Sequence, residues 1–587
     1  MASSTREVVT LQFGHYANFV GTHWWNVQES SFCYDTSSGS SPSEINHDVL
    51  FREGLTLTGE QTYTPRLLLY DLKGSLNTLK EDGTLYDVME KDNEVHWMGD
   101  VTLHTSETSG KNQFLKDLER IDKGELPTEE DASSAGTEDS HDEIQEATPH
   151  SSTNPLEVFR SKLYNLDGSV SVWSDFLRIH LHPRTVSILS EYAHDLEQDM
   201  FDVFDYGQQL LGTPRVSSDL EDRLHFFVED CDSLQGFQVL VDPYNGFGGL
   251  AAEVLEQMSE DYDNKGILTF GCYPSVYVRR SPIVDYHRLI CTVLSVTKLS
   301  TSSSLYAPLS VAAGLGRDPG PTASFPYMTY NPTLHYHTAG ILAATLDTCT
   351  LPYRTRSDAV LMTDLTGTLN YSGRKMAALS ARLPFPITLD GSLAASLSQF
   401  VAAPDLVSLC PGVKEPGRTF MQSVVLRGVP SNRIRIPDPA AHADSIFRDC
   451  RSVNDCLKRY LQRVYPGTLN AGTVVNEPMT VTTPFPHLFQ PEIAHDGLVG
   501  FKPRSPMQGV EKVPAMTSLS SPSGLQGCLT ALHGEVEKLD IRRFHRFLDA
   551  GLEEDEFKEA VESLRRLART YQTGDNEMAE DSDDDSD

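Results

Sequence analysis

One stretch constrains the fold of this 587-residue chain more than any other: residues 236–255, which read GFQVLVDPYNGFGGLAAEVL. A short apolar segment is followed by Gly246, Gly248 and Gly249, and then by a helical pattern. A strand, a glycine-rich turn and a helix can hold a phosphate at the helix N-terminus, where backbone N–H groups point outward and the helix dipole favours an anion. The same pattern fits a tight strand-to-helix turn that binds nothing, so both interpretations stay open.

Two further stretches have the same character. Residues 8–13 are apolar enough for a buried strand, residues 14–18 form a turn, and residues 19–28 follow as a helix. Another strand, within residues 62–72, ends at Asp71. Repeated units of this kind predict an α/β domain built on a Rossmann-type sheet. Because ligand loops of such sheets gather at the carboxyl ends of the strands, we expect residues 12–18, 71 and 245–249 to meet at one edge.

Charge and cysteine content limit the function classes. The chain has 83 acidic and 48 basic residues and a formal net charge of −35, which argues against a nucleic-acid partner and against passive adsorption to anionic lipid. Its nine cysteines, an odd number without a CxxC pair, fit free thiols in a reducing compartment. We find no secretory signal and no apolar run of ~18 residues, so we expect a soluble cytosolic or nuclear protein without a transmembrane segment.

Shifts in composition predict the domain organisation. Residues 105–154 are acidic and serine-rich and cannot bury apolar area, so we expect a disordered insertion there, and residues 574–587 read as an acidic disordered tail. We predict strands at residues 359–363 and 420–426 and a basic helix at residues 448–465. The predicted units are residues 1–104 and 155–305 for the α/β domain, 306–505 for an α+β intermediate domain, and 506–573 for C-terminal helices.

Several motifs, taken in order, resemble tubulin. Residues 14–21, GHYANFVG, resemble its first nucleotide loop, Gly-Gln-Cys-Gly-Asn-Gln-Ile-Gly, and residues 231–238 resemble the segment that leads into its glycine-rich phosphate loop. Residues 544–572 resemble the last tubulin helices. Over residues 6–572 the full set is similar to the Misato family of divergent tubulin-like proteins. This resemblance implies a tubulin-like fold, with a Rossmann-type sheet domain, an α+β intermediate domain and C-terminal helices.

The resemblance also implies a function. It points to a non-enzymatic protein that regulates mitochondrial distribution and morphology, including network formation and fusion, from the cytosolic face of the outer mitochondrial membrane. The implied partners are outer-membrane proteins, with tubulin or a chaperonin as further candidates. Two alternatives stay open: a GTP-binding, assembling GTPase, and a cofactor in tubulin and microtubule biogenesis.

The same resemblance selects the candidate site. The residues that match the nucleotide loops are Gly14, His15, Asn18, Asp71, Gly246, Gly248 and Gly249. The loops are degenerate, because Lys73 stands where the family of tubulins has a magnesium-side Glu, only Gly168 remains of a second loop, and Tyr244 and Asn245 replace two glycines. We therefore expect no resident cofactor, with GTP as the alternative, and we expect neither catalytic residues nor tubulin-like filaments.

Two histidine pairs are candidate metal ligands. His180 with His182, and His335 with His337, are two residues apart, and on a strand each pair would face one side and could bind zinc. No cysteine, aspartate or glutamate cluster stands beside either pair in the sequence, so we predict no metal site.

Overall fold

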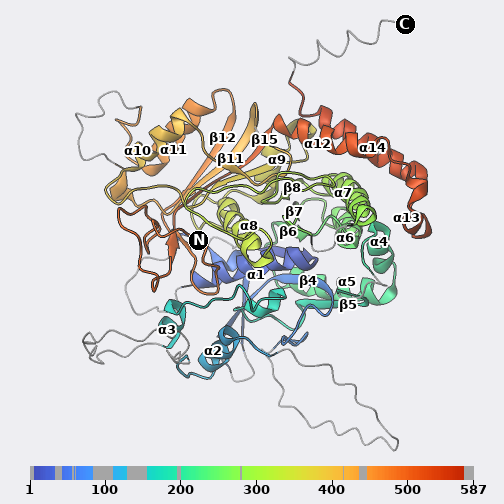
Figure 1. Ribbon diagram of the computed structural model, residues 1–587, viewed down its shortest axis with the longest axis horizontal. Helices are drawn as coiled ribbons and strands as arrows, with labels where there is room; N and C mark the ends of the chain where they lie inside the picture. Colours follow the sequence, from blue (N-terminus) through green and yellow to red (C-terminus); the bar gives the residue numbers. More distant parts are fainter. Residues whose placement is uncertain are drawn as a thin grey trace, which may run out of the picture.

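The computed structural model describes residues 6–32, 43–55, 59, 61–83, 110–127, 155–194, 200–277, 281–413, 416–434 and 446–573. These residues form two main sheets (Figure 1). The first is a six-stranded, wholly parallel sheet in the order β5-β4-β1-β6-β7-β8. Its strands are β1 (Val8–Phe13), β4 (Leu67–Lys73), β5 (Val186–Ala193), β6 (Gly236–Val241), β7 (Gly266–Cys272) and β8 (Leu305–Leu309).

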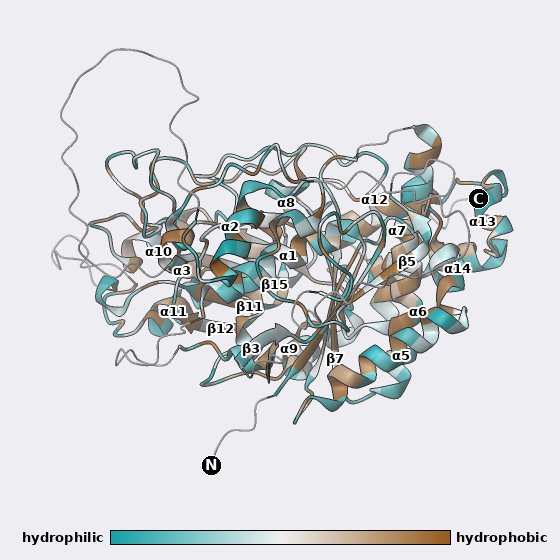
Figure 2. Ribbon diagram, turned by 90° about the horizontal axis from the view of Figure 1, so that it is seen from below, coloured by the Kyte–Doolittle hydropathy of each residue, from teal (hydrophilic) through white to brown (hydrophobic). Residues whose placement is uncertain are grey.

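Both faces of this sheet are covered. Every residue of β1 is buried, and its apolar side chains alternate between two clusters: Val9, Leu11 and Phe13 belong to one and Val8 to the other. Near-continuous apolar strands of this kind are expected where helices cover a parallel sheet on both sides. The first cluster contains α4 (Phe204–Leu211), α5 (Pro214–Glu229), α6 (Gly246–Asp261) and α7 (Pro282–Ser302), and the second contains α1 (His15–Ser30) and α8 (His335–Cys349). In Figure 2 the strands beside the β7 label are brown, whereas the peripheral helix α5 carries both teal and brown turns.

The second sheet is mixed, in the order β10-β9-β15-β11-β12, with a parallel pairing only between β11 and β12. Its strands are β9 (Ala378–Arg382), β10 (Val407–Ser408), β11 (Thr419–Arg427), β12 (Leu469–Val475) and β15 (Ala515–Pro522). Helices α10 (Leu393–Ala402) and α11 (Val453–Val464) share a core with this sheet, and α9 (Met362–Leu369) packs on β11 and β7. Beyond the sheet, α12 (Gly524–Val536), α13 (His545–Asp549) and α14 (Glu554–Arg569) return to pack on α7.

The smaller elements lie at the periphery. They are the hairpin of β2 (Phe51–Leu55) and β3 (Gln61–Pro65), the pair β13 (Met479–Thr480) and β14 (Lys512–Val513), and the helices α2 (Gln113–Asp122) and α3 (Pro155–Ser161). Throughout the described part of the chain, no helix combines the length and the apolar character needed to cross a bilayer.

Helix α8 joins the two sheets. It is buried from Tyr336 to Cys349, packing on α1 on one side and on β11 and β15 on another, as expected for a helix that is apolar all round. At its C-terminal end the buried Asp347 carboxylate accepts hydrogen bonds from Arg354 (3.0 Å) and from Arg427 of β11 (2.5 Å). Burial alone would raise the pKa of the Asp347 carboxyl, but the two guanidinium groups outweigh it and lower that pKa. The ion-paired triad therefore fixes the helix to the second sheet.

Comparison with the sequence-based expectations confirms the fold class and several elements. Residues 420–426 lie in β11, and residues 448–465 contain α11. The strand predicted at residues 359–363 is wrong, because α9 begins at Met362; such a short apolar run does not distinguish a strand from a helix start. The two sheets extend past the predicted domain ends at residues 305 and 505. Strand β8 of the first sheet ends at Leu309, and β15 of the second ends at Pro522.

The predicted disordered insertion is wrong over residues 113–122. Helix α2 occupies that segment, capped by the Asn112 side chain, and its Phe114 is fully buried between Phe159 and Tyr164, with ring centroids 5.6 and 5.7 Å away. The acidic composition of this segment obscured the strongly amphipathic pattern that α2 follows. Residues 128–154 and the tail at residues 574–587 lie outside the described residues, so disorder there stays a prediction.

Phe114 gives a test of where the ordered part ends. Phe114→Ala removes a fully buried ring and should lower the free energy of unfolding by about 3–5 kcal/mol, measured by chemical denaturation. Deleting residues 128–152, by contrast, should leave the thermal midpoint nearly unchanged. A Phe114→Ala protein as stable as the parent, or a large loss on deletion, would contradict this boundary.

Candidate functional site

The carboxyl ends of β1, β4 and β6 meet at the first turn of α1, as the sequence predicts. Gly14 links β1 to α1 with a φ of +111°, a conformation that favours glycine, and its N–H donates to the Tyr70 carbonyl at 3.1 Å. A Cβ on Gly14 would lie 2.5 Å from the Asp242 carboxylate. The backbone of this turn is therefore in close contact with the residue that follows β6.

Asp242 caps α1. The Tyr16 N–H donates to Asp242 Oδ2 at 2.9 Å and the Ala17 N–H donates to Oδ1 at 2.8 Å, while the Tyr244 hydroxyl donates to Oδ2 at 3.2 Å. The first N–H groups of a helix have no partner within the helix and are the groups that a bound phosphate would accept from. Here an internal carboxylate, fully buried, accepts from two of them.

The environment of Asp242 also changes its protonation. Burial raises the pKa of the Asp242 carboxyl to about 8, against the lowering effect of the Tyr16 and Ala17 N–H groups, and the charge of Asp71 adds to the rise. A phosphate brought to this helix end would have to displace the Asp242 carboxyl group, and at pH values above its pKa it would also be repelled by the ionised carboxylate.

The glycines after β6 serve the packing of α6. A Cβ on Gly249 would lie 1.9 Å from the Phe204 carbonyl oxygen, one on Gly246 would lie 2.7 Å from the Phe201 ring, and one on Gly248 would lie 2.1 Å from Ser295 Oγ. All three glycines are buried, so α4 and α7 approach the α6 backbone where side chains would clash. These contacts fit the interpretation of the three glycines as a tight strand-to-helix turn that binds no ligand.

The N-terminus of α6 has its own cap. The Asn245 side chain accepts from the Phe247 N–H at 2.9 Å, and the Gly246 N–H donates to the Phe201 carbonyl at 3.0 Å. Thus both helix ends that the nucleotide loops would use are capped by groups of this chain.

Asp71 is the centre of the second part of the edge. Its carboxylate is fully buried at the end of β4 and accepts five hydrogen bonds. The donors are Asn18 Nδ2 (3.0 Å), Trp173 Nε1 (2.8 Å), the Leu72 N–H (2.8 Å), His15 Nδ1 (3.2 Å) and His194 Nε2 (2.7 Å). Burial alone would raise the pKa of the Asp71 carboxyl, but the charge and hydrogen bonds of the two histidines outweigh it and hold that pKa well below its usual range.

The candidate residues thus divide into two groups. The structure brings Gly14, His15, Asn18 and Asp71 together, whereas Gly246, Gly248 and Gly249 are in the contact between α6 and its neighbours. Gly168 lies in an exposed turn, but Trp173 of the same loop reaches Asp71.

Sequence reasoning missed three contributors: Asp242, His194 and Phe201. Asp242 and His194 each follow the last residue of a strand, β6 and β5, and that position at the carboxyl end of a parallel strand is the signal that could have found them. No comparable signal marks Phe201, which precedes α4.

The two histidine pairs do not form the strand geometry that zinc would need. His180 and His182 lie outside the strands, with His180 beside Asp122 and His182 stacked on Phe226. His335 and His337 are in the first turn of α8, where side chains two apart point in different directions. Within the described residues, the one group of at least three side chains able to hold a metal is His15, Asp71 and His194.

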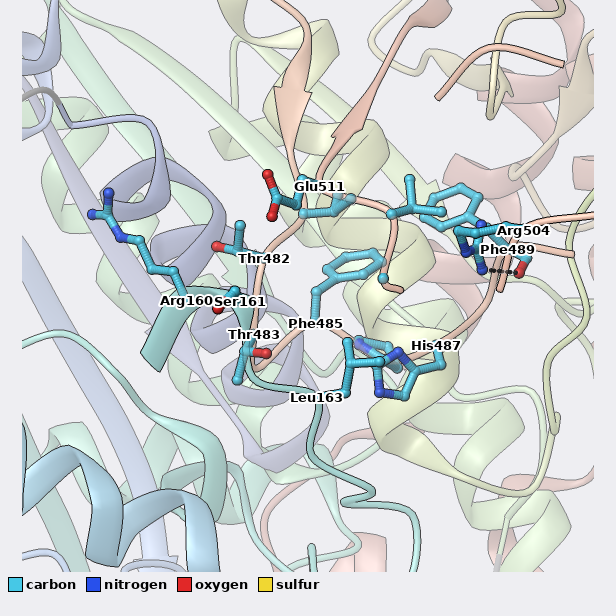
Figure 3. Close-up of a pocket in the computed structure, with 14 residues that line it drawn as sticks. Arg160, Ser161, Leu163, Thr482, Thr483, Phe485, His487, Phe489, Arg504 and Glu511 are labelled. Carbon is cyan, nitrogen blue, oxygen red and sulfur yellow. Dashed lines mark hydrogen bonds between the residues drawn. The ribbon is translucent and has the colours of Figure 1, made fainter. Parts of the chain in front are cut away.

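Two cavities lie away from this edge. One, of about 40 Å³, is lined by segments 160–163, 481–489 and 504–511, and Figure 3 shows Phe485 lying between the Thr483 side of the cavity and Arg504. A wider hollow of about 440 Å³ adjoins it and shares Arg160, Thr482 and Glu511. Neither is lined by residues of the first turn of α1, although the wider hollow includes Ser30 at the other end of that helix. The first cavity is far smaller than ligand sites, which span about 300–1,000 Å³.

Magnesium and GTP, which the tubulin resemblance brings to mind, do not fit the residues at this edge. Mg²⁺ takes oxygen ligands, whereas the groups around Asp71 include two imidazoles, and Lys73 is exposed at the end of β4. Two of the α1 N–H groups that a phosphate would accept from, those of Tyr16 and Ala17, already donate to Asp242. At this edge of the sheet, the first turn of α1 is capped by a carboxyl group of the chain itself, beside a cluster of two histidines and Asp71.

The buried carboxyl of Asp242 gives a pH test. Its folded-state pKa of about 8 lies above the unfolded value of about 3.9, so between these values the folded protein holds a proton that the unfolded chain has released. The free energy of unfolding should therefore fall as the pH rises through this window, by up to about 1.4 kcal/mol per pH unit, relative to Asp242→Asn. Chemical denaturation of both proteins at several pH values measures the difference.

Asp364→Asn, at an exposed position on α9, is the matched control and should follow the wild-type protein. A difference between wild type and Asp242→Asn that stays constant with pH would contradict the raised pKa.

Comparison with known proteins agrees with this fold. Residues 6–120 match the family model described as the Misato Segment II tubulin-like domain, and residues 165–355 match the one described as a Tubulin domain. The chain is 40% identical over 583 residues to "Protein misato homolog 1" of Homo sapiens, covering 98% of this chain and 99% of that protein. It is 40% identical over 596 residues to the Danio rerio protein of the same name, covering 100% of both.

A more distant relative has the same extent. "Protein misato" of Drosophila melanogaster is 30% identical over 584 residues, which cover 97% of this chain and 98% of that protein. The resemblance found in the sequence motifs is thereby confirmed, and the chain belongs to the Misato family of tubulin-like proteins.

Proposed function

We propose that this protein is a non-enzymatic, tubulin-like scaffold that regulates mitochondrial distribution and morphology at the cytosolic face of the outer mitochondrial membrane. The observation that carries the non-enzymatic part is the Asp242 carboxylate on the first turn of α1. A nucleotide-dependent tubulin needs that helix end for phosphate, and here it is capped from within. The mitochondrial part rests on what the resemblance to the Misato family implies.

Without a bound nucleotide, the nucleotide-dependent assembly of tubulin-like filaments would also be lost. A head-to-tail interface repeats at every subunit, so a small loss of affinity per contact suppresses long polymers. The net charge of −35 adds repulsion along any stack, although salt screens it beyond ~8 Å at physiological ionic strength. Surface that tubulin uses for polymerisation would then be available to another protein.

The negative net charge also makes a receptor protein a better membrane attachment point for this chain than the lipid surface itself. Anionic membrane surfaces attract basic segments, and this chain has 83 acidic against 48 basic residues. We therefore propose that outer-membrane proteins recruit it, and that tubulin or a chaperonin is the partner under the alternative of a role in tubulin biogenesis. The other alternative is a GTP-binding protein that assembles.

Nucleotide content separates these functions. Protein purified under native conditions, denatured and chromatographed should release far less than one guanine nucleotide per chain, because the α1 N–H groups are capped. Tubulin processed in parallel is the positive control. One nucleotide per chain, or regular filaments by electron microscopy after addition of GTP and Mg²⁺, would support the assembling GTPase and refute the scaffold.

Depletion in cells tests the mitochondrial role. Loss of the protein should fragment or cluster the mitochondrial network, seen by fluorescence microscopy, and both the wild-type protein and Asp242→Asn should restore it if no nucleotide cycle is needed. Lys538→Gln, at an exposed position after α12, is a neutral control. Normal mitochondria beside reduced tubulin and sparse microtubules would instead support the biogenesis cofactor.

A further inference from the structure

The strongest unassigned feature is the cluster formed by His15, Asp71 and His194. Its three members come from different elements: His15 begins α1, Asp71 lies near the end of β4, and His194 follows β5. One nitrogen or oxygen atom of each lies within 4.8 Å of those of the other two. Strand order predicts that His15 and Asp71 lie near each other, whereas His194 is 123 positions from Asp71 and joins them only in the folded structure.

The distances are close to those of a metal site. His15 Nδ1 lies 3.2 Å from Asp71 Oδ2, and His194 Nε2 lies 2.7 Å from Asp71 Oδ1. A tetrahedral zinc ion with bonds of about 2.0–2.1 Å holds its ligand atoms about 3.3 Å apart. The two imidazoles contact different oxygens of Asp71, and turning both nitrogens toward one shared point beside the carboxylate would give three ligands.

The hydrogen bonding of Asp71 is an independent observation. A carboxylate has lone pairs for about four donors, and Asp71 receives five, of which the His15 contact at 3.2 Å is the longest. The donors from Asn18, Trp173 and the Leu72 backbone orient the carboxylate without using either imidazole. Such outer hydrogen bonds are what positions a metal-binding carboxylate.

A further buried polar group adjoins the cluster. Asn18 is fully buried, its Nδ2 donates to Asp71, and its Oδ1 has no hydrogen-bond partner among the described residues. Buried amide oxygens normally have a partner, which can be a water molecule or a water bound to an ion.

The cluster is accessible and rigid at the same time. The side chains of His15 and His194 are 21% and 23% exposed, whereas Asp71 is fully buried. The His194 N–H donates to the Lys73 carbonyl at 3.2 Å, and the His15 ring packs edge-on against Phe19 with centroids 5.2 Å apart. An ion could thus enter from solvent and find ligands whose backbones are already fixed.

We propose that His15, Asp71 and His194 form a zinc-binding site. Two imidazole nitrogens and one carboxylate oxygen suit zinc or a similar divalent transition metal, whereas magnesium and calcium prefer oxygen ligands. The ion replaces the two histidine–aspartate hydrogen bonds, and water completes the fourth position. Bound zinc ties the start of α1 to the ends of β4 and β5, so this edge is held by a metal and requires no nucleotide.

Cobalt and zinc binding to the intact protein test the site. Full-length protein without an affinity tag is stripped with EDTA and titrated with Zn²⁺ by calorimetry, and with Co²⁺ followed by visible absorption. We expect one ion per chain and a higher thermal midpoint with zinc. His194→Gln should weaken binding by about 100-fold or more, since even the loss of an outer-shell partner costs 10–100-fold.

His180→Gln is the matched control, because His180 also lies beside an aspartate but outside the cluster. It should bind zinc as the wild type does. Binding that persists in the double variant His15→Gln/His194→Gln, or less than a tenth of an ion per wild-type chain, would overturn the proposal.

X-ray absorption of the zinc-loaded wild-type protein gives a result that does not depend on any variant folding. We expect only nitrogen and oxygen neighbours at about 2.0–2.2 Å. A sulfur neighbour at about 2.3 Å would assign the metal to cysteines and refute the site at His15, Asp71 and His194.

Discussion

The Asp242 carboxylate on the first turn of α1 is the interaction around which the α/β domain is arranged. It joins the end of β6 to the helix that follows β1, so two neighbouring strands and their connections share one buried hydrogen-bonded contact. Gly14 allows this contact, because any side chain there would meet the carboxylate. Further along α1, Gly21 lies so close to β1 that a Cβ would be 2.1 Å from the Gln12 amide, which holds the helix against the sheet.

The glycine-rich turn leads into α6, whose first turn is capped separately by the Asn245 side chain. In a phosphate loop, glycines let the backbone reach the ligand, but the helix end here is already satisfied and the turn is free to specialise in packing. Gly249 brings the α6 backbone against the Phe204 carbonyl, and Gly246 faces the Phe201 ring. In this chain, the close approach that these glycines allow is to neighbouring segments of the protein itself.

The sequence predicts the positions of some site residues and not of others for physical reasons. Parallel strands place their carboxyl ends at one edge, so the proximity of Gly14 and Asp71 follows from strand order alone. His194 also follows the end of a parallel strand, but its nearness to Asp71 depends on β5 pairing with β4 across a long acidic stretch of sequence, with a register shift just before the strand's end. Asp242 was visible at a strand end, but a carboxylate there can bind a ligand or cap a helix, and only the distance to Tyr16 and Ala17 distinguishes them.

A helix N-terminus buried at a sheet edge must have its N–H groups satisfied by something, because leaving buried donors without a partner costs about 1–3 kcal/mol each. A protein that uses phosphate for this purpose folds most stably when nucleotide is bound, and its conformation follows the nucleotide state. Here Asp242 satisfies two of the α1 N–H groups from within the chain, so under the proposed function the stability of α1 would not depend on a bound nucleotide. In the scaffold function proposed above, the tubulin-like sheet serves as a fixed platform, and switching would come from a partner or from ligands at other groups, such as the histidines beside Asp71.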